Sequence, residues 1–95
     1  MIKKIKELFQ NKRYEIIIEN YLFKNRCIHD IMQLKTIGYD QARLIINDVF
    51  DGSINYQIFV QAFNDKNEAE KVISDLKDKG YKYVMLKTIY TFNKK

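Results

Sequence analysis

Residues that build catalytic and metal sites are scarce in this sequence, which has one cysteine (Cys27), one histidine (His29) and three glycines among 95 residues. A single cysteine excludes an internal disulfide framework and any metal site made of several cysteines. Cys27 and His29 are two positions apart, so on a helix their side chains point about 200° away from each other. We therefore interpret Cys27 as a small buried apolar residue, and we expect no metal and no cofactor.

The scarcity of glycine bears on catalysis in the same way. Each of the three glycines is explained as a turn or a helix cap, so no glycine-rich loop remains to cradle a phosphate. An acylphosphatase grips phosphate with a glycine-rich first loop, whereas residues 20–26 contain no glycine. Catalysis needs a nucleophile with a base, a carboxylate pair in a cleft or a metal, and the acidic residues here are scattered. The sequence therefore predicts a protein that is not an enzyme.

Long apolar runs are also missing. No run approaches the roughly 20 residues that a membrane-spanning helix needs. The basic N-terminus, MIKKIKELFQNKR, has no uninterrupted apolar stretch of the kind found in a secretory signal. Hydrophobic residues make up 46% and charged residues 31% of the chain, which is typical of a globular domain. We expect a single cytoplasmic domain, residues 1–95, that makes no membrane contact.

The net charge of +5 is concentrated at the two ends of the chain. Residues 1–13 carry five basic residues and one acidic residue, a net of +4, and Lys94 and Lys95 add +2. Subtracting these from +5 leaves about −1 for residues 14–93. Any attraction to nucleic acid is therefore expected at the tails, not over a basic face of the domain. The candidate nucleic-acid contacts are Lys3, Lys4, Lys6, Lys12 and Arg13.

The N-terminal segment, residues 1–13, is predicted to form a short amphipathic helix. Ile2, Ile5, Leu8 and Phe9 recur at near-helical spacing among basic residues. A helix of about a dozen residues is marginal alone, so its apolar stripe needs a surface to pack on. In one interpretation, the apolar stripe packs on the rest of the domain, residues 14–95. In the others, the helix anchors to a membrane surface or contacts nucleic acid or a partner.

The rest of the chain reads as two strand–helix–strand units, residues 14–53 and 54–92. In the first unit, a strand-forming run at 14–21 precedes a helix that ends at Gly38, and a second apolar run at 42–50 ends at an Asp-Gly hairpin signal. In the second unit, residues 54–63 alternate as a strand. Asn64, Asp65 and Asn67 are N-cap candidates, with Asn67 and Glu70 fitting a capping box. The helix ends at Gly80, and the last strand runs from about 82 to 92.

The two units match at a constant offset of 42 residues without a gap. The matched pairs fall on strands, helix faces and helix ends, as in Tyr14 with Tyr56, Leu34 with Leu76 and Gly38 with Gly80. Two such units joined by a hairpin predict an α+β fold. This is the ferredoxin-like βαββαβ plait, with a four-stranded antiparallel sheet and two helices on one face.

The second unit also resembles known families. YQIFVQAF, NEAEKVISDLKDKGY and YVML resemble a half-repeat of the SPOR domain, a peptidoglycan-binding module of two such units. This resemblance implies the fold, but we do not carry over the ligand, because Gln61 and Ala62 precede Phe63 where the family usually has a small residue, often glycine. The run KNEAEKVISDLKDKGYKYVML also looks like the C-terminal domain of the bacterial ribosomal stalk protein. That alternative implies a helix at residues 40–50.

The plait assigns alternate strand residues to a helix-covered face and an open face. The core is expected to contain Ile16, Ile18, Leu44, Ile46, Ile58, Val60, Val84 and Leu86, packed against Ile28, Ile31, Leu34, Val72, Ile73 and Leu76. The open face is expected to carry the interface residues Ile17, Tyr21, Ile45, Val49, Phe59, Phe63, Tyr83, Met85 and Ile89. So large an apolar face needs a cover, which is the N-terminal helix, a second copy in a homodimer, or another partner.

Three functions follow, of which protein binding is the leading hypothesis. A regulatory protein that dimerises or docks through the open face looks like the small inhibitors of phages and mobile elements, anti-CRISPR proteins among them. The second hypothesis is nucleic-acid binding through the basic N-terminal helix and the aromatic face, although residues 56–63 lack the glycine and basic start of an RNA-recognition motif. The third hypothesis is a small-ligand regulatory domain.

Overall fold

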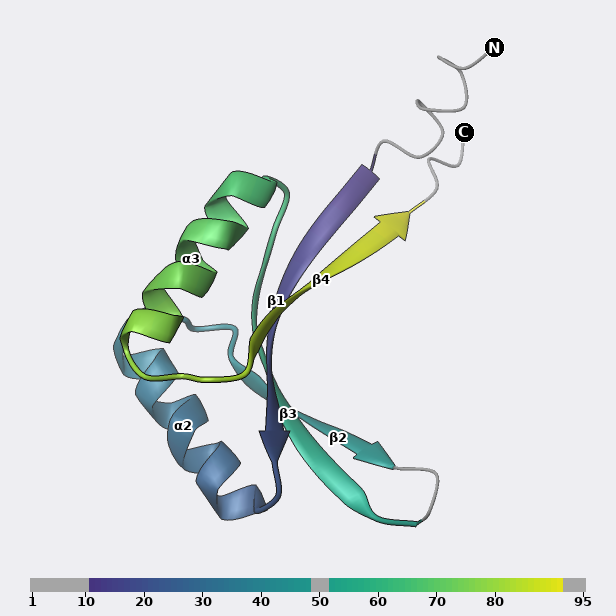
Figure 1. The fold of residues 1–95 in the computed structure, drawn as a ribbon, viewed down its shortest axis with the longest axis vertical. Coiled ribbons are helices and arrows are strands. Elements are labelled where there is room, and N and C mark those ends of the chain that lie inside the picture. The colour runs from purple at the N-terminus through teal and green to yellow at the C-terminus, as the bar shows by residue number, and fades with distance from the viewer. Residues whose placement is uncertain (1–10, 49–51, 92–95) are drawn as a thin grey trace.

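The computed structural model describes residues 11–48 and 52–91, which form four strands and two helices (Figure 1). In chain order these elements are β1 (Asn11–Tyr21), α2 (Lys24–Thr36), β2 (Arg43–Asp48), β3 (Ile54–Phe63), α3 (Lys66–Asp78) and β4 (Val84–Thr91). The strands form one sheet in the order β2-β3-β1-β4, and every neighbouring pair is antiparallel. Both helices cover the same face of the sheet (Figure 1). The predicted α+β fold with a four-stranded antiparallel sheet and two helices is confirmed, and its element order is compatible with the expected plait.

Two predicted segments need correction. The alternative helix at residues 40–50 is wrong, because residues 43–48 form β2 and pair with β3 from Arg43 opposite Phe59 to Asp48 opposite Ile54. The predicted N-terminal helix lies outside the described residues at positions 1–10. Its last three positions, 11–13, belong to β1 instead, where they pair with residues 89–91 of β4. This pairing satisfies backbone groups that a lone short helix would leave to solvent.

The helix ends follow the glycine signals. Gly38 and Gly80 have φ values of 110° and 105°, in the left-handed region that favours glycine. The amide of Tyr39 donates to the carbonyl of Leu34 at 3.0 Å, and the amide of Tyr81 donates to the carbonyl of Leu76 at 3.1 Å. Both helices therefore end with the same hydrogen-bond arrangement, in which the residue after the glycine reaches back over the last turn.

The start of α3 differs from the capping box that the sequence predicts. Asp65 is the N-cap, and its Oδ1 accepts a hydrogen bond from the backbone amide of Asn67 at 2.9 Å. Asn67 is consequently inside the first turn and is not the cap. The aspartate carboxylate is the better acceptor here, because it also bears a negative charge at the positive end of the helix dipole.

The core lies between the sheet and the two helices. Its buried members come from every described helix and strand except β2, and from Ala42 just before β2: Ile16, Ile18, Cys27, Ile31, Leu34, Ala42, Ile58, Val60, Ala69, Leu76 and Val84. Ile46 and Ile28, which the sequence places in the core, are instead 54% and 38% exposed. Ile46 lies on β2, which is an edge strand of the sheet, and the β2–β3 hairpin extends past the helix layer (Figure 1).

Two β-bulges, one in β3 and one in β1, change which face of the sheet the residues beyond them occupy. Ile16 and Ile17 pair with Gln61 and Phe59, so β3 has one extra residue at this point. A second shift lies between Ile18 and Tyr21 of β1, where Asn20 has a φ of 70°. Each extra residue reverses the alternation of side chains beyond it.

The prediction that Tyr21 and Phe63 lie on the open face is therefore wrong. Both side chains pack against the buried core on the helix-covered face. Their paired residues, Tyr56 and Tyr14, pack against the same core. Strict alternation fails here because each bulge inserts one residue between these side chains and the regular part of the strand.

No helix within residues 11–48 and 52–91 is long and apolar enough to span a membrane.

Candidate functional site

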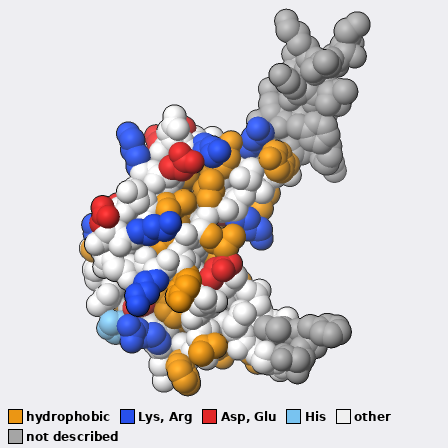
Figure 2. All heavy atoms as spheres, in the orientation of Figure 1, with side chains coloured by type: hydrophobic (Ala, Val, Ile, Leu, Met, Phe, Trp, Pro, Cys, Tyr) orange, Lys and Arg blue, Asp and Glu red, His pale blue; other side chains and the backbone are white. Residues whose placement is uncertain are grey.

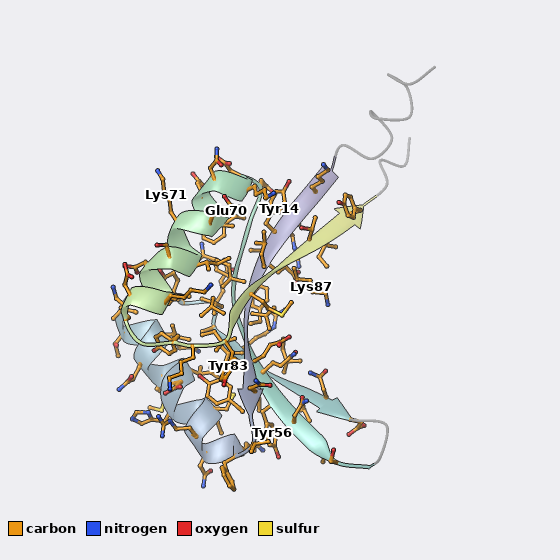
Figure 3. All side chains as sticks on the ribbon, in the orientation of Figure 1. Tyr14, Tyr56, Glu70, Lys71, Tyr83 and Lys87 are labelled. Atoms are coloured by element: carbon orange, nitrogen blue, oxygen red, sulfur yellow. The ribbon has the colours of Figure 1, made fainter. Side chains whose placement is uncertain are left out.

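The open face of the sheet carries an apolar row across three strands. Strand pairing places Phe59 of β3 beside Ile17 of β1, and Ile17 beside Met85 of β4. Arg43 of β2 is opposite Phe59 and extends the row to the edge of the sheet. We call these four residues the sheet-face row. In Figure 3, Lys87 on β4 lies on this side of the sheet, turned away from the helices, whereas Tyr14 on the neighbouring strand lies on the α3 side.

The centre of the sheet-face row is shielded within a single chain. Phe59 and Ile17 are 3% and 4% exposed, although they lie on the face opposite α2 and α3. The Arg43 guanidinium carbon lies 4.2 Å from the centroid of the Phe59 ring, which is a close cation–π contact. Met85, at 37% exposed, is the most accessible apolar member of the row. The face is thus less open than the sequence implies, because a long charged side chain covers part of it.

Polar side chains surround the sheet-face row. The amide nitrogen of Gln57 donates to Glu19 Oε2 at 3.4 Å on one side of the row. On the other side, the Arg13 guanidinium donates from Nε to Glu15 Oε2 at 3.1 Å, and Glu15 is opposite Lys87. An apolar centre with an arginine-covered aromatic ring and a polar rim is the usual composition of a protein interface.

The remaining predicted interface residues are spread over different places. Ile45 and Ile89 are partly buried and lie on the open face, by their pairing with Gln57 and Arg13. Tyr83 precedes β4, is 56% exposed and lines a pocket at one end of the sheet. Val49 lies outside the described residues. The structure therefore brings together Ile17, Ile45, Phe59, Met85 and Ile89 out of the predicted set.

The predicted nucleic-acid contacts are only partly described. Lys3, Lys4 and Lys6 lie outside the described residues. Lys12 and Arg13 are exposed on β1, and the Lys12 Nζ lies 5.6 Å from the centroid of the Tyr90 ring on β4. Arg13 is paired with Glu15, so its charge is partly neutralised.

Sequence reasoning missed a pocket of about 380 Å³ between the β1–α2 and α3–β4 connections. Its lining comes from the end of β1, the start of α2 and the segment before β4. The lining residues are Ile18, Glu19, Asn20, Tyr21, Leu22, Phe23, Arg26, Asp30, Gly80, Tyr81, Lys82 and Tyr83. We call it the loop pocket. Its one sequence signal is that Leu22 and Phe23, two large apolar residues, directly follow the strand-forming run at 14–21.

A hydrogen bond between β1 and α2 forms part of the loop pocket. The Tyr21 hydroxyl donates to Asp30 Oδ2 at 2.5 Å, and the Asp30 side chain is only 15% exposed. Burial, and then the hydrogen bond to the Asp30 carboxylate, raise the pKa of Tyr21 well above its usual range. The Asp30 carboxylate also lies 4.0 Å from Arg26 Nε and 3.4 Å from His29 Nδ1. This hydrogen bond holds the end of β1 against α2.

Cys27 is buried next to this pair, as predicted. Its thiol donates to the carbonyl of Gln57 at 3.7 Å, and burial raises its pKa to about 11 from 9.0. In the unfolded chain the thiol ionises near the lower value, so the unfolded state is favoured as pH rises from 9 towards 11. We therefore expect the contribution of Cys27 to the free energy of unfolding to be constant below pH 9 and to fall above it.

Urea unfolding at a series of pH values tests this expectation. Cys27→Ala should lose less stability than the wild type between pH 9 and 11, because the alanine has no proton to release. Tyr21, whose pKa is also raised, is present in both proteins and causes part of the loss of stability in each. Identical declines in the two proteins would show that the thiol ionises equally in the folded and unfolded states.

Within residues 11–48 and 52–91, no three His, Cys, Asp or Glu side chains come together as a metal-binding group. The described residues thus define a small α+β protein with two candidate binding surfaces, the sheet-face row and the loop pocket.

Comparison with known proteins finds a partial relative. The chain is similar to the Holliday junction branch migration complex subunit RuvA of Mycoplasma mycoides subsp. mycoides, with 40% identity over 74 residues. The match takes in 70% of this chain and 36% of the relative, so the chain spans about a third of that protein's length. No family model matches the chain, and no solved structure gives a significant match.

Proposed function

We propose that the chain is a non-enzymatic binding protein that holds a protein partner on its open sheet face. The observation that carries this proposal is the sheet-face row, an apolar strip over three strands that neither helix covers. Methionine and arginine are enriched in protein interfaces, and Met85 and Arg43 are the exposed members of the row. A regulatory role in the cytoplasm, on a ferredoxin-like plait, fits the small size of the chain, as does an inhibitor of the anti-CRISPR kind.

A second copy of the chain is the partner that the open face fits first. Basic and acidic side chains alternate around the row, with Arg13 beside Glu15 and Lys87 opposite Glu15. A face that carries both charges can complement itself across a twofold axis, because each basic group then meets an acidic group of the other copy.

Met85→Glu tests this interface with little risk to the fold, because Met85 is 37% exposed. We expect the wild type to be a dimer in light scattering, and the variant to self-associate at least about tenfold more weakly, since a carboxylate would be buried in the interface. Met32→Glu is the matched control, because Met32 is 63% exposed on α2 and far from the open face.

Dimerisation that Met85→Glu weakens and Met32→Glu leaves unchanged supports the proposal. A wild type that stays monomeric at every concentration excludes the second copy as partner. A dimer that both variants leave intact places the interface elsewhere on the molecule.

Nucleic-acid binding is a second candidate function, and one observation favours it. The relative with 40% identity is by name a subunit of a Holliday junction branch migration complex. The net charge of +5 adds a general attraction to phosphate. Nucleic-acid binding cannot use base stacking on Phe59 of the open face, because this residue is too buried.

A further inference from the structure

We propose that the loop pocket binds an unpaired base of a single-stranded nucleic acid, with the neighbouring phosphate held by Arg26 and Lys82. This inference rests on the nucleic-acid candidate function and names the site for it. The loop pocket lies between the β1–α2 and α3–β4 connections and shares one residue, Glu19, with the polar side chains around the sheet-face row.

Three large apolar side chains are exposed together at the rim of the loop pocket. Leu22 and Phe23 are 74% and 73% exposed, and Tyr83 is 56% exposed. All three line the same pocket, although they come from connections far apart in sequence. Figure 2 shows hydrophobic side chains exposed at the end of the molecule where α2 begins, beside Lys and Arg side chains. Contiguous exposed apolar groups of this kind mark binding sites.

Hydrogen bonds fix the backbone positions of Phe23 and Tyr83. The amide of Glu19 donates to the carbonyl of Tyr83 at 2.9 Å, which ties the α3–β4 connection to the end of β1. The amide of Cys27 donates to the carbonyl of Phe23 at 3.2 Å, which fixes Phe23 at the start of α2. Because the backbone positions of both aromatic residues are fixed, less conformational freedom is lost when a ligand binds.

The most exposed charged side chains of the loop pocket are basic. Arg26, with a side chain that is 75% exposed, and Lys82, which is also exposed, both line the pocket. The two carboxylates in the lining, Glu19 and Asp30, are less exposed than these basic groups. Glu19 accepts from Gln57, and Asp30 accepts from Tyr21 and lies 4.0 Å from Arg26 Nε. The first turn of α2 contains no acidic residue that would repel a phosphate.

Single-stranded nucleic acid fits this combination better than a protein segment does. Aromatic side chains beside basic residues are how proteins bind unpaired nucleotides, since every base presents a ring face and every nucleotide brings a phosphate. A base in a duplex is stacked between its neighbours and cannot enter a pocket. We therefore expect the loop pocket to prefer single strands to duplex.

The experiment measures fluorescence anisotropy of a labelled oligothymidylate at low salt. Tyr83→Ala and Phe23→Ser are each expected to weaken binding by about tenfold, which is typical of losing one stacked base. Phe23→Ser is expected to fold at least as well as the wild type, because residue 23 is the N-cap of α2 and serine is a favourable N-cap. Tyr90→Ala is the matched control, since Tyr90 is 59% exposed but lies at the far end of β4.

The outcomes separate this inference from the function on which it rests. Weaker binding by the two pocket variants, unchanged binding by Tyr90→Ala and poor competition by a duplex support the pocket. Oligonucleotide binding that falls with salt but is equal in all variants overturns the pocket and leaves nucleic-acid binding through the tails. No binding by the wild type at low salt overturns both. Pocket variants that lose binding of an acidic, aromatic peptide but not of the oligonucleotide reassign the pocket to a protein partner.

Discussion

Leu34→Ala is expected to lower the free energy of unfolding by about 2–5 kcal/mol. Leu34 has no exposed surface and lies at the centre of the core between α2 and the sheet. Truncation removes three carbon atoms and leaves a cavity that the close-packed surroundings fill only partly. Because a domain of this size has only a small stability margin, the variant is expected to be partly unfolded at 37 °C.

Leu22→Ala is the control for Leu34→Ala, with the same residue type and the same change. Leu22 is 74% exposed, so its truncation is expected to change the free energy of unfolding by less than about 0.5 kcal/mol. Urea unfolding followed by circular dichroism measures both variants. Equal losses in the two variants would contradict the position of the core described above.

Phe59→Ala is expected to lower the free energy of unfolding by about 3–5 kcal/mol, as much as a core substitution, although Phe59 lies on the face opposite α2 and α3. The ring is 3% exposed in the single chain, and its loss also removes the surface over which the Arg43 guanidinium lies. The expected loss is therefore a property of the monomer and does not depend on protein concentration.

Urea unfolding of Phe59→Ala and the wild type at two protein concentrations provides the measurement. A loss below about 1 kcal/mol at low concentration would show that Phe59 is accessible in the monomer, and a loss that grows with concentration would place its burial in an oligomer. This result also decides how interface experiments are designed. A substitution at Phe59 is expected to destabilise the fold, so a loss of binding would not report on the contact itself. Met85 is partly exposed, so it can be changed while the chain stays folded.

The sequence predicted most of the fold because its signals are local. Gly38 and Gly80 end the helices, and β3 has the predicted bounds, Ile54–Phe63. The alternation around Ile16–Ile18 and Ile58–Val60 identified their faces correctly, since one periodicity holds within each regular stretch. The start of α3 was less certain, because three candidate caps are adjacent in sequence and only one, Asp65, accepts the hydrogen bond.

The candidate sites were harder to predict than the fold. Ile17, Phe59 and Met85 were expected on one surface, and strand pairing puts them there. The burial of Phe59 could not be predicted from its own strand, because the Arg43 side chain that lies over its ring comes from another strand. The loop pocket was missed for the same reason: residues 20–23 and 80–83 become neighbours only when β1 pairs with β4.

By itself, the sequence determined the order and type of the elements, the buried thiol of Cys27 and the apolar character of the strands. Only the tertiary structure decided the faces of Tyr21 and Phe63. Each bulge places one extra residue of β1 or β3 opposite its partner strand, and that extra residue turns the side chains beyond it to the other side of the sheet. Such a mismatch is a property of two paired strands, and a pattern within one strand does not record it.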